Sequence, residues 1–457
     1  VFLFGGNDSF NMLTPNDDDE HARYVRRRGG LINQATGGVS GGLAWPKDDA
    51  DHPEYNLRPI AASQGPNAGR SFGVIRSMPN LHSLYNNGRA AFVSNVGTLV
   101  RPTTRADFNS GIELPKGLFS HNDEQRNWQS SIPQSRNAVK GWAGRIADLL
   151  TDPVAPDTIA MSIALDRLNV IQTGENVIPY VIDNQNGARS LERYQSRSGR
   201  FNRIRTAAID GVFPKDDGTL RATYADLLQR THAQANRDAI DAAIAYNAAT
   251  SEVTFDTDFP NTGIGRQAEQ VARAIAARKT LGHQRQIFFI SRGNFDDHNG
   301  LVAFNGYTPA GHFARLGEVD AAIMALQNAL EEIESTPGEL TNNVVTFSAS
   351  DFARTLASNG NGSDHAWGSN HFVVGGPAAI NASVWGEYPT NLQNPRHSEY
   401  GHLDTDRGRL IPTTSVDEYA AELATWFGVP DDSNLELVLP NIRNFHRGAG
   451  KPIGFLN

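Results

Sequence analysis

Acidic residues and histidines follow apolar segments at several places in this chain. The apolar run Ile287–Ile290 leads through a glycine turn to Asp296–His298, and the run Val344–Phe347 leads to Asp351. The segment Asp364–His371 stands directly before a third apolar run. Open α/β sheets carry their ligand-binding residues at the carboxyl ends of the strands, and carboxylates and neutral imidazoles bind divalent cations. We therefore expect a metal site on the rim of a sheet.

Each of these segments also has an ordinary structural interpretation. Asp296–His298 can be a polar turn with an aspartate that caps the next helix. Successive residues of an extended chain point in different directions, so we expect about two of these three side chains to converge. Asp351 can likewise be a helix cap, and His365 can simply pack under Trp367.

Two further segments contain reactive residue types. Gly5-Gly6-Asn7-Asp8 follows the apolar run Val1–Phe4, and glycines at a strand end let the backbone approach an anion or a metal, although such turns are common. Ser120 stands beside His121, but adjacent residues of a strand face opposite sides, so the pair is not by itself a catalytic dyad. The chain has no phosphate-binding glycine loop after a strand.

The elements that position these residues follow from hydrophobic periodicity. Apolar runs predict buried strands at residues 1–4, 90–96, 161–165, 287–290, 343–347 and 372–374. Helical spacing predicts helices over residues 77–89, 219–250, 265–281, 312–334 and 416–428. Because strands and helices alternate through residues 265–375, we expect βαβ units and a largely parallel sheet.

The polar segments 14–75 and 185–215 are expected to be long surface insertions rather than core. With them, we interpret residues 1–457 as one elaborated domain.

Composition excludes several classes of function. The net charge is −9 and no basic stripe is visible, so nucleic acid is not expected as a partner. The chain has no cysteine, which excludes disulfides and thiolate chemistry and suits a protein outside the cytoplasm. No apolar run is long enough for a membrane span. The sequence opens without Met in an apolar strand, and we expect that a secretion leader has been removed.

Taken in order, these segments resemble the secreted family called domain of unknown function 1501, over nearly the whole chain. The marks of the resemblance are Phe4–Asp8 with Asn11, Ser120-His121 leading to Trp128, Gly141–Arg145, Phe295–His298, Ser350–Thr355, Asp364–Gly368 and the helix Tyr419–Trp426. That family is similar to a branch of the alkaline phosphatase and sulfatase superfamily. The resemblance implies an α/β fold, namely an alkaline-phosphatase-like three-layer sandwich with a mostly parallel central sheet and long loop insertions. It also implies a twin-arginine leader and a secreted or periplasmic location.

The superfamily pattern implies roles for individual residues. One or two divalent cations (zinc, calcium or magnesium) would be held by Asp8, Asp296, His298, Asp351 and His365. The choice between Asp296 and Asp297 stays open, because the superfamily spacing there is usually longer. Ser120 falls near the nucleophile position, at the head of a helix whose N–H groups can hold an oxyanion.

Two departures from the superfamily pattern matter. Phe352 stands where phosphatases carry a metal-binding histidine, so a second metal would become oxygen-rich, which suits calcium or magnesium, or would be absent. The segment around Ser120 also lacks the motif that converts a sulfatase nucleophile to formylglycine.

The resemblance implies a metal-dependent hydrolase of phosphate or sulfate esters, with a small molecule or a polysaccharide as substrate. Ser120 would attack the ester, and His121 or His371 would orient it or protonate the leaving group. The alternative is a non-catalytic extracellular surface or assembly protein with a structural metal, which Phe352 and the long insertions favour. Such a protein would be a homo-oligomer or would bind a secreted protein of the neighbouring family, domain of unknown function 1800.

Overall fold

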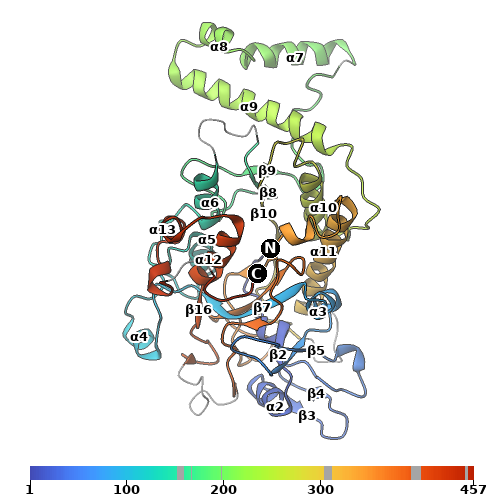
Figure 1. Ribbon diagram of the computed structural model, residues 1–457, viewed down its shortest axis with the longest axis vertical. Coiled ribbons are helices and arrows are strands. Elements are labelled where there is room, and N and C mark those ends of the chain that lie inside the picture. Colours follow the sequence, from blue (N-terminus) through green and yellow to red (C-terminus); the bar gives the residue numbers. More distant parts are fainter. Residues whose placement is uncertain (152–158, 166, 197, 303–310, 393–402, 448–450) are drawn as a thin grey trace.

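Several small sheets flanked by helices make up the mixed α/β fold (Figure 1). The computed structural model describes residues 1–151, 159–165, 167–196, 198–302, 311–392, 403–447 and 451–457. Five strands form the largest sheet in this part of the chain, in the order β12-β14-β7-β15 with β16 also on β7. Their bounds are β7 (Ala90–Gly97), β12 (Thr346–Phe347), β14 (Ser369–Val374), β15 (Val384–Trp385) and β16 (Thr414–Ser415).

Two three-stranded sheets contain only parallel pairs. One has the order β11-β1-β13, from β1 (Phe2–Leu3), β11 (Ser291–Arg292) and β13 (Ala349–Ser350). The other has the order β10-β8-β9, from β8 (Ser162–Leu165), β9 (Tyr180–Ile182) and β10 (Ile287–Phe289). Because parallel strands end at the same edge, the loops that follow β1, β11 and β13 lie next to one another although they are hundreds of residues apart.

The predicted α/β class is confirmed, but the sheets are smaller and more mixed than expected. In the five-stranded sheet, β14 runs antiparallel to both β7 and β12, whereas β15 and β16 run parallel to β7. Two antiparallel sheets complete the set, with orders β2-β6-β5 and β3-β4. Their bounds are β2 (Leu13–Pro15), β3 (Leu31–Ile32), β4 (Val39–Ser40), β5 (Arg58–Ala61) and β6 (Ser71–Val74).

The helices lie on either side of these sheets, with α10 and α11 on one side and α5, α6, α12 and α13 on the other (Figure 1). Capping sets their ends: Ser415 and Glu418 form a capping box at the start of α12, and Gly428 ends the helix in the left-handed conformation. The bounds are α1 (Ser9–Met12), α2 (Asp18–Arg27), α3 (Pro79–Asn86), α4 (Arg105–Ser110), α5 (His121–Ser130), α6 (Trp142–Leu150), α7 (Arg200–Val212), α8 (Asp217–Thr223), α9 (Leu227–Thr250), α10 (Gly263–Ala276), α11 (His312–Ile333), α12 (Val416–Phe427) and α13 (Asp432–Val438), with 3-10 helices at Pro53–Tyr55, Thr341–Asn343 and Ile442–Asn444.

The hydrophobic core includes residues from the segment 14–75, which was expected to lie on the surface. Tyr24, Trp45 and Phe72 are buried in the same cluster as residues of α10 and α11. That expectation is wrong for these residues, because short apolar stretches separated by glycines and aspartates do not show a helical or strand period. The segment 185–215, also expected to be exposed, carries α7, which has no buried residue in the described structure.

The helices α7, α8 and α9 form an arm that extends away from the rest of the molecule (Figure 1). In the described part of the chain, no helix has the length and apolar character needed to cross a membrane.

Candidate metal centre

Three loops meet at the carboxyl edge of the sheet β11-β1-β13. The register pairs Leu3 with Arg292 on one side and with Ser350 on the other, so the three strands end level with one another. Residues Gly5–Asp8 follow β1, Asp296–His298 follow β11, and Asp351 follows β13. The first turn of α5 packs onto the same edge. The sequence thus places its polar side chains where parallel strands end.

His121, Asp296 and His365 form a group whose ligand atoms all lie within 4.8 Å of one another. His121 Nε2 lies 3.4 Å from Asp296 Oδ2, and His365 Nε2 lies 3.3 Å from Asp296 Oδ1. His298 lies beside His365, with its Nε2 3.1 Å from Asp296 Oδ1 and 3.0 Å from His365 Nε2. Three imidazoles therefore surround one carboxylate. Of the predicted metal ligands, this group contains Asp296 and His365, and His298 lies beside it; the group adds His121.

Each of the three imidazoles has its Nδ1 beside an oxygen acceptor. His121 Nδ1 lies 2.7 Å from Asp351 Oδ2. His298 Nδ1 lies 3.2 Å from Asp364 Oδ1. His365 Nδ1 lies 2.8 Å from the Phe119 carbonyl. A carbonyl or an ionised carboxylate can only accept a hydrogen bond, so Nδ1 carries the proton in each ring. In the neutral imidazole, Nε2 then presents its lone pair toward Asp296.

This arrangement fits a cation. The Nε2 atoms of His298 and His365 face each other at 3.0 Å, and two lone pairs at that distance repel unless a proton or a metal ion lies between or beside them. His121 Nε2 is buried and has no hydrogen-bond partner among the described residues. Three such nitrogens and a carboxylate are a common donor set for zinc, and an oxygen acceptor on the second nitrogen of each histidine is the usual outer support of such ligands.

Two carboxylates provide this outer support. Asp351 is fully buried, and it accepts hydrogen bonds from the Gln125 amide at 2.8 Å and from the Gly5 N–H at 3.3 Å in addition to His121. Asp364 accepts from Asn359 at 3.1 Å and from Arg407 at 2.6 Å in addition to His298.

The surroundings of Asp364 keep it ionised. Burial would raise the pKa of Asp364, but its hydrogen bonds to Asn359 and His298 and the charge of Arg407 outweigh that effect and lower the pKa. The carboxylate therefore remains an acceptor for the imidazole that it orients.

Asp296 is held by Arg354, a guanidinium with no solvent exposure. Arg354 Nη1 donates to Asp296 Oδ1 at 2.8 Å, and Arg354 Nη2 donates to the Ser363 carbonyl at 2.8 Å. Burial would raise the pKa of Asp296, but Arg354, with smaller effects of His121 and His298, lowers it. Asp296 is thus an ionised ligand with one oxygen shared with an arginine. Its neighbour Asp297 instead pairs with Arg315, so the geometry selects Asp296.

Phe352 forms an apolar wall beside two of the imidazoles. Its ring centroid lies 4.4 Å from that of His365, nearly stacked, and 4.9 Å from that of His121. The ring fits because Gly6 has φ +84° and no side chain: a Cβ at this position would collide with the Phe352 ring.

Asp8 lies outside the histidine group. It is fully buried and forms an ion pair with Arg28, which ends α2 and is also fully buried. Burial raises the pKa of Asp8 more than Arg28 lowers it. The structure thus supplies this predicted ligand with an internal cationic partner, while Asp351 reaches the centre only through His121 and Gln125.

The predicted catalytic residues lie in different surroundings. Ser120 precedes α5, and its hydroxyl makes no capping hydrogen bond within the described structure. His121 is the first residue of that helix. His371 lies in the core, where its ring packs against Trp128 and Tyr419 with centroid distances of 5.0 and 5.8 Å. Burial lowers the pKa of His371 to about 3, and the structure does not bring it to the histidine group.

Several residues of the centre were not predicted as site residues. Asp364 stands beside His365 in the sequence, and that adjacency is a usable signal for an aspartate that supports a ligand. Gln125 lies one helical turn after His121, which is a weaker signal. Nothing in the sequence marks the Phe119 carbonyl, because every residue supplies a backbone carbonyl.

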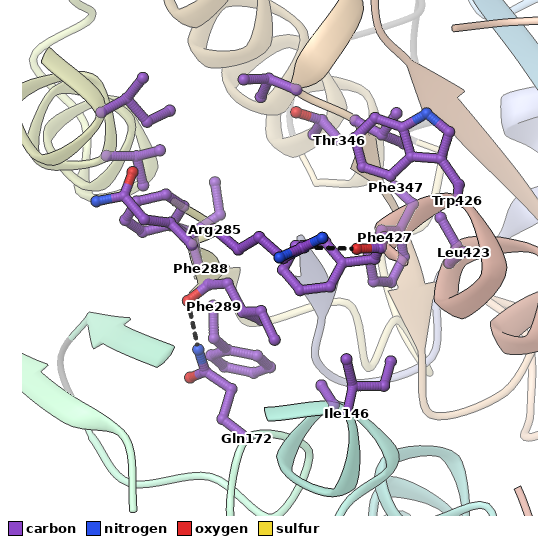
Figure 2. Close-up of a pocket in the computed structure, with 18 of the residues that line it drawn as sticks. Ile146, Gln172, Arg285, Phe288, Phe289, Thr346, Phe347, Leu423, Trp426 and Phe427 are labelled. Atoms are coloured by element: carbon purple, nitrogen blue, oxygen red, sulfur yellow. Dashed lines mark hydrogen bonds between the residues drawn. The ribbon is translucent and has the colours of Figure 1, made fainter. Parts of the chain in front are cut away.

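A separate cavity of about 610 Å³ lies beside the strands β1, β10 and β12 (Figure 2). Aromatic side chains line it, and Gln172 donates to the Ile287 carbonyl at 2.9 Å while Arg285 donates to the Phe427 carbonyl at 3.1 Å. In the part of the chain that the structure describes, no residue of the histidine group lines this cavity. The lining includes Val1, Phe288, Phe289, Phe347, Trp426 and Phe427.

Comparison with known proteins gives one match. A family model with the description "Protein of unknown function (DUF1501)" matches residues 1–433. No curated protein and no solved structure matches the chain.

Proposed function

Because the chain belongs to the DUF1501 family, which is described only as a protein of unknown function, we propose an activity from the metal centre itself: a metal-dependent hydrolase of phosphate or sulfate esters. The observation that carries the proposal is the convergence of three Nε2 lone pairs on Asp296. The side chains of Asp296 and His298 are 43% and 40% exposed, so a substrate can reach the group from solvent. An accessible metal is what a catalytic site requires, whereas structural sites are closed.

We infer one ion rather than two, held by His121, Asp296, His298 and His365. The nitrogen-rich donor set suits zinc or a similar transition metal better than calcium or magnesium, which prefer oxygen. Of the carboxylates predicted for a second ion, Asp8 is paired with Arg28, and Asp351 is bound by His121, Gln125 and the Gly5 N–H. The position of Asp296 and His298 after the parallel strand β11, and of the supporting Asp351 after β13, supports the finer proposal of an alkaline-phosphatase-like architecture.

When bound, the ion would polarise the ester oxygens and lower the pKa of the nucleophile. Ser120 would supply that nucleophile: its Oγ gives up its proton and bonds to the phosphorus or sulfur while the bond to the ester oxygen breaks, and the leaving alkoxide takes up a proton. Water would then release phosphate or sulfate and restore the Ser120 hydroxyl. The Ser120 hydroxyl is not used for capping, so it is available. The N–H groups of the first turn of α5 would stabilise the developing negative charge.

The test is an assay of the zinc-loaded protein on a panel of phosphate and sulfate esters. We expect turnover that is lost on chelation, in Ser120→Ala and in His365→Ala, and that persists in His82→Ala, which alters a surface histidine. Loss of bound zinc in His365→Ala but not in Ser120→Ala separates ligand from nucleophile. A loaded protein with no turnover on the panel would refute the hydrolase proposal.

A second candidate is a non-catalytic extracellular surface or assembly protein that keeps the ion for stability. Two contacts favour it: Arg354 occupies one oxygen of Asp296, and Phe352 closes the side where phosphatases hold a further histidine. This candidate predicts one tightly bound ion with no turnover. It also predicts a stoichiometric complex in native extracts, either with a second copy or with a protein of the domain of unknown function 1800 family. Under both candidates we propose a secreted or periplasmic location, which cell fractionation tests.

A further inference from the structure

The arm α7–α9 carries a helix whose orientation is fixed by a buried arginine. Arg237 of α9 has 1% side-chain exposure. Its Nη1 donates to Asp210 Oδ1 of α7 at 3.0 Å and to the Tyr194 hydroxyl at 2.9 Å, and its Nη2 donates to Asp241 Oδ1 at 2.9 Å. These contacts hold the polar side of α7 against α9. The hydrogen bonds of Arg237 therefore turn the opposite side of α7 toward solvent.

That outward side is apolar. Phe201, Ile204 and Val212 are 86%, 54% and 49% exposed, and the exposed Ala208 lies between them. Their spacing of three, four and four residues places all four on one face of the helix. This solvent-facing stripe (Phe201, Ile204, Ala208 and Val212) is the reverse of an ordinary surface helix, which buries its apolar side.

Basic residues surround the stripe. At about 3.6 residues per turn, Arg200 and Arg205 fall on the two borders of the stripe, and both are exposed. The segment 185–215 contains seven Lys or Arg residues against two Asp or Glu residues, a net charge of +5, in a chain whose net charge is −9. Helix α7 and the segment before it thus present positive charge and apolar side chains together, while the rest of the chain is acidic.

We propose that α7 docks this protein onto an anionic lipid surface as an interfacial helix. A helix with exposed Phe and Ile on one face and arginines at its borders has the composition of helices that lie in the headgroup region. α7 and α8 lie at the outer end of the arm, beyond α9 (Figure 1). The acidic remainder of the chain would be repelled by the same surface, and the arm holds it away. A pairing of two arms, in contrast, would bring two segments of net charge +5 together.

The absence of cysteine makes a direct test available. The variant Ala208→Cys of the full chain carries a single thiol in the stripe, which can be labelled with an environment-sensitive fluorophore. We expect a blue shift when the labelled protein meets vesicles of phosphatidylcholine with roughly 30% phosphatidylglycerol. We expect no shift with pure phosphatidylcholine vesicles. A label at Ser83→Cys, an exposed position on α3 and far from the arm, is the control that should not respond.

Vesicle co-sedimentation of unlabelled variants separates the two contributions. Arg200→Gln/Arg205→Gln should weaken binding about fivefold for each arginine. Phe201→Ser/Ile204→Ser should weaken it about tenfold or more. Matched controls on the body are Arg136→Gln and Ile178→Ser, both exposed side chains, which should bind like the parent. All four sites are exposed, so unchanged circular dichroism is expected and shows that folding is intact.

Three results would overturn the proposal. Equal binding to neutral and anionic vesicles would remove the role of charge. If Phe201→Ser/Ile204→Ser binds vesicles as well as the parent, the apolar stripe has no role, and the arginines would be attracted to any polyanion. A dimer in solution that the same double variant disperses would assign the stripe to a second copy of the chain. None of these measurements depends on ester hydrolysis.

Discussion

At the scale of single residues, each imidazole depends on one oxygen acceptor beside its Nδ1. Asp364 serves His298, and Asp351 serves His121. The Phe119 carbonyl serves His365. Each oxygen fixes one tautomer, so that the other ring nitrogen is free to bind a cation. Arg407 and Asn359 in turn keep Asp364 ionised. The affinity of the centre for a metal ion should therefore depend on these acceptors as well as on the ligands.

The first prediction concerns Asp364. In Asp364→Asn the charge that supports His298 is lost, and the amide can present a donor to Nδ1 instead of an acceptor. Zinc affinity should fall about 10- to 100-fold, the usual cost of removing such a partner. Competition with a chromophoric chelator measures the change. Asp406→Asn, an exposed aspartate on the same loop as Arg407, is the control, and an unchanged affinity in Asp364→Asn would show that His298 is not a ligand.

Sequence alone predicted part of this residue set. Asp296 and His298 follow an apolar run and His365 precedes one, and the end of a strand is a position that sequence pattern reveals. The buried pairing of Asp8 was not predictable, because the sequence does not show which arginine of the run Arg26–Arg28 turns inward. The burial of His371 was also missed, since a histidine in an apolar run reads the same whether it faces a site or the core.

At the scale of elements, the start of α5 is the critical junction. Phe119 has φ +71°, a left-handed conformation that is unfavourable for a bulky residue. Its carbonyl holds His365, the next residue is Ser120, and His121 opens the helix. The Arg409 guanidinium lies over the Phe119 ring at 5.2 Å and donates to the His365 carbonyl at 2.8 Å. One strained residue thus fixes the positions of two ligands and the proposed nucleophile.

The second prediction uses this strain. Phe119→Ala and Phe119→Gly lose the same ring contacts, but only alanine keeps a Cβ in the left-handed region. The glycine variant should therefore be more stable than the alanine variant by about 1 kcal/mol. Urea denaturation of both proteins gives the difference. At an ordinary backbone position the order would be the reverse, and finding alanine more stable would contradict the left-handed conformation.

The third prediction concerns the pH dependence that α5 adds through Glu124. This side chain is 1% exposed, and burial raises its pKa from 4.5 to about 8, against the hydrogen bonds from Thr98 and Asn127. Between these pH values the unfolded chain has lost the proton and the folded chain keeps it. The free energy of unfolding should therefore fall by about 1.4 kcal/mol per pH unit over this window.

Glu124→Gln tests this effect, because the amide does not titrate. Its stability relative to the parent should rise steadily from pH 5 to pH 8, as measured by denaturation at each pH. Glu54→Gln, which changes an exposed glutamate, should follow the parent at every pH. A parallel curve for Glu124→Gln would mean that Glu124 is ionised in the folded protein.

Most elements were predictable where the pattern is long. The helices predicted at 265–281, 312–334 and 416–428 are α10, α11 and α12, with ends that differ by a few residues. The direction of β14 was not predictable, because a short apolar run specifies burial but not whether its neighbours run parallel. That single reversal turns the expected parallel sheet into a mixed one.

At the scale of the whole molecule, the centre joins distant parts of the chain. His121 comes from α5, Asp296 and His298 from the loop after β11, and His365 from the loop before β14. An unfolded chain cannot hold these residues together, so an ion that binds them stabilises only the folded state.

The fourth prediction follows from this linkage. Zinc at a free concentration of about 1,000 times its Kd should stabilise the folded protein by about 4 kcal/mol. Thermal melting with zinc and with a chelator measures the effect, and His365→Ala should lose most of it. If the melting temperatures with and without chelator coincide in the parent, the four residues do not bind an ion.

The fit between Gly6 and Phe352 bears on how this centre can change over evolution. The slot beside His121 and His365 is already shaped for a flat ring, and the glycine that makes room for it is in place. An imidazole is flat as well and smaller than a phenyl ring, so the exchange Phe352→His would add a nitrogen donor without moving the backbone. A protein with this fold is therefore one substitution away from an additional histidine ligand, and the reverse substitution would remove that ligand in one step.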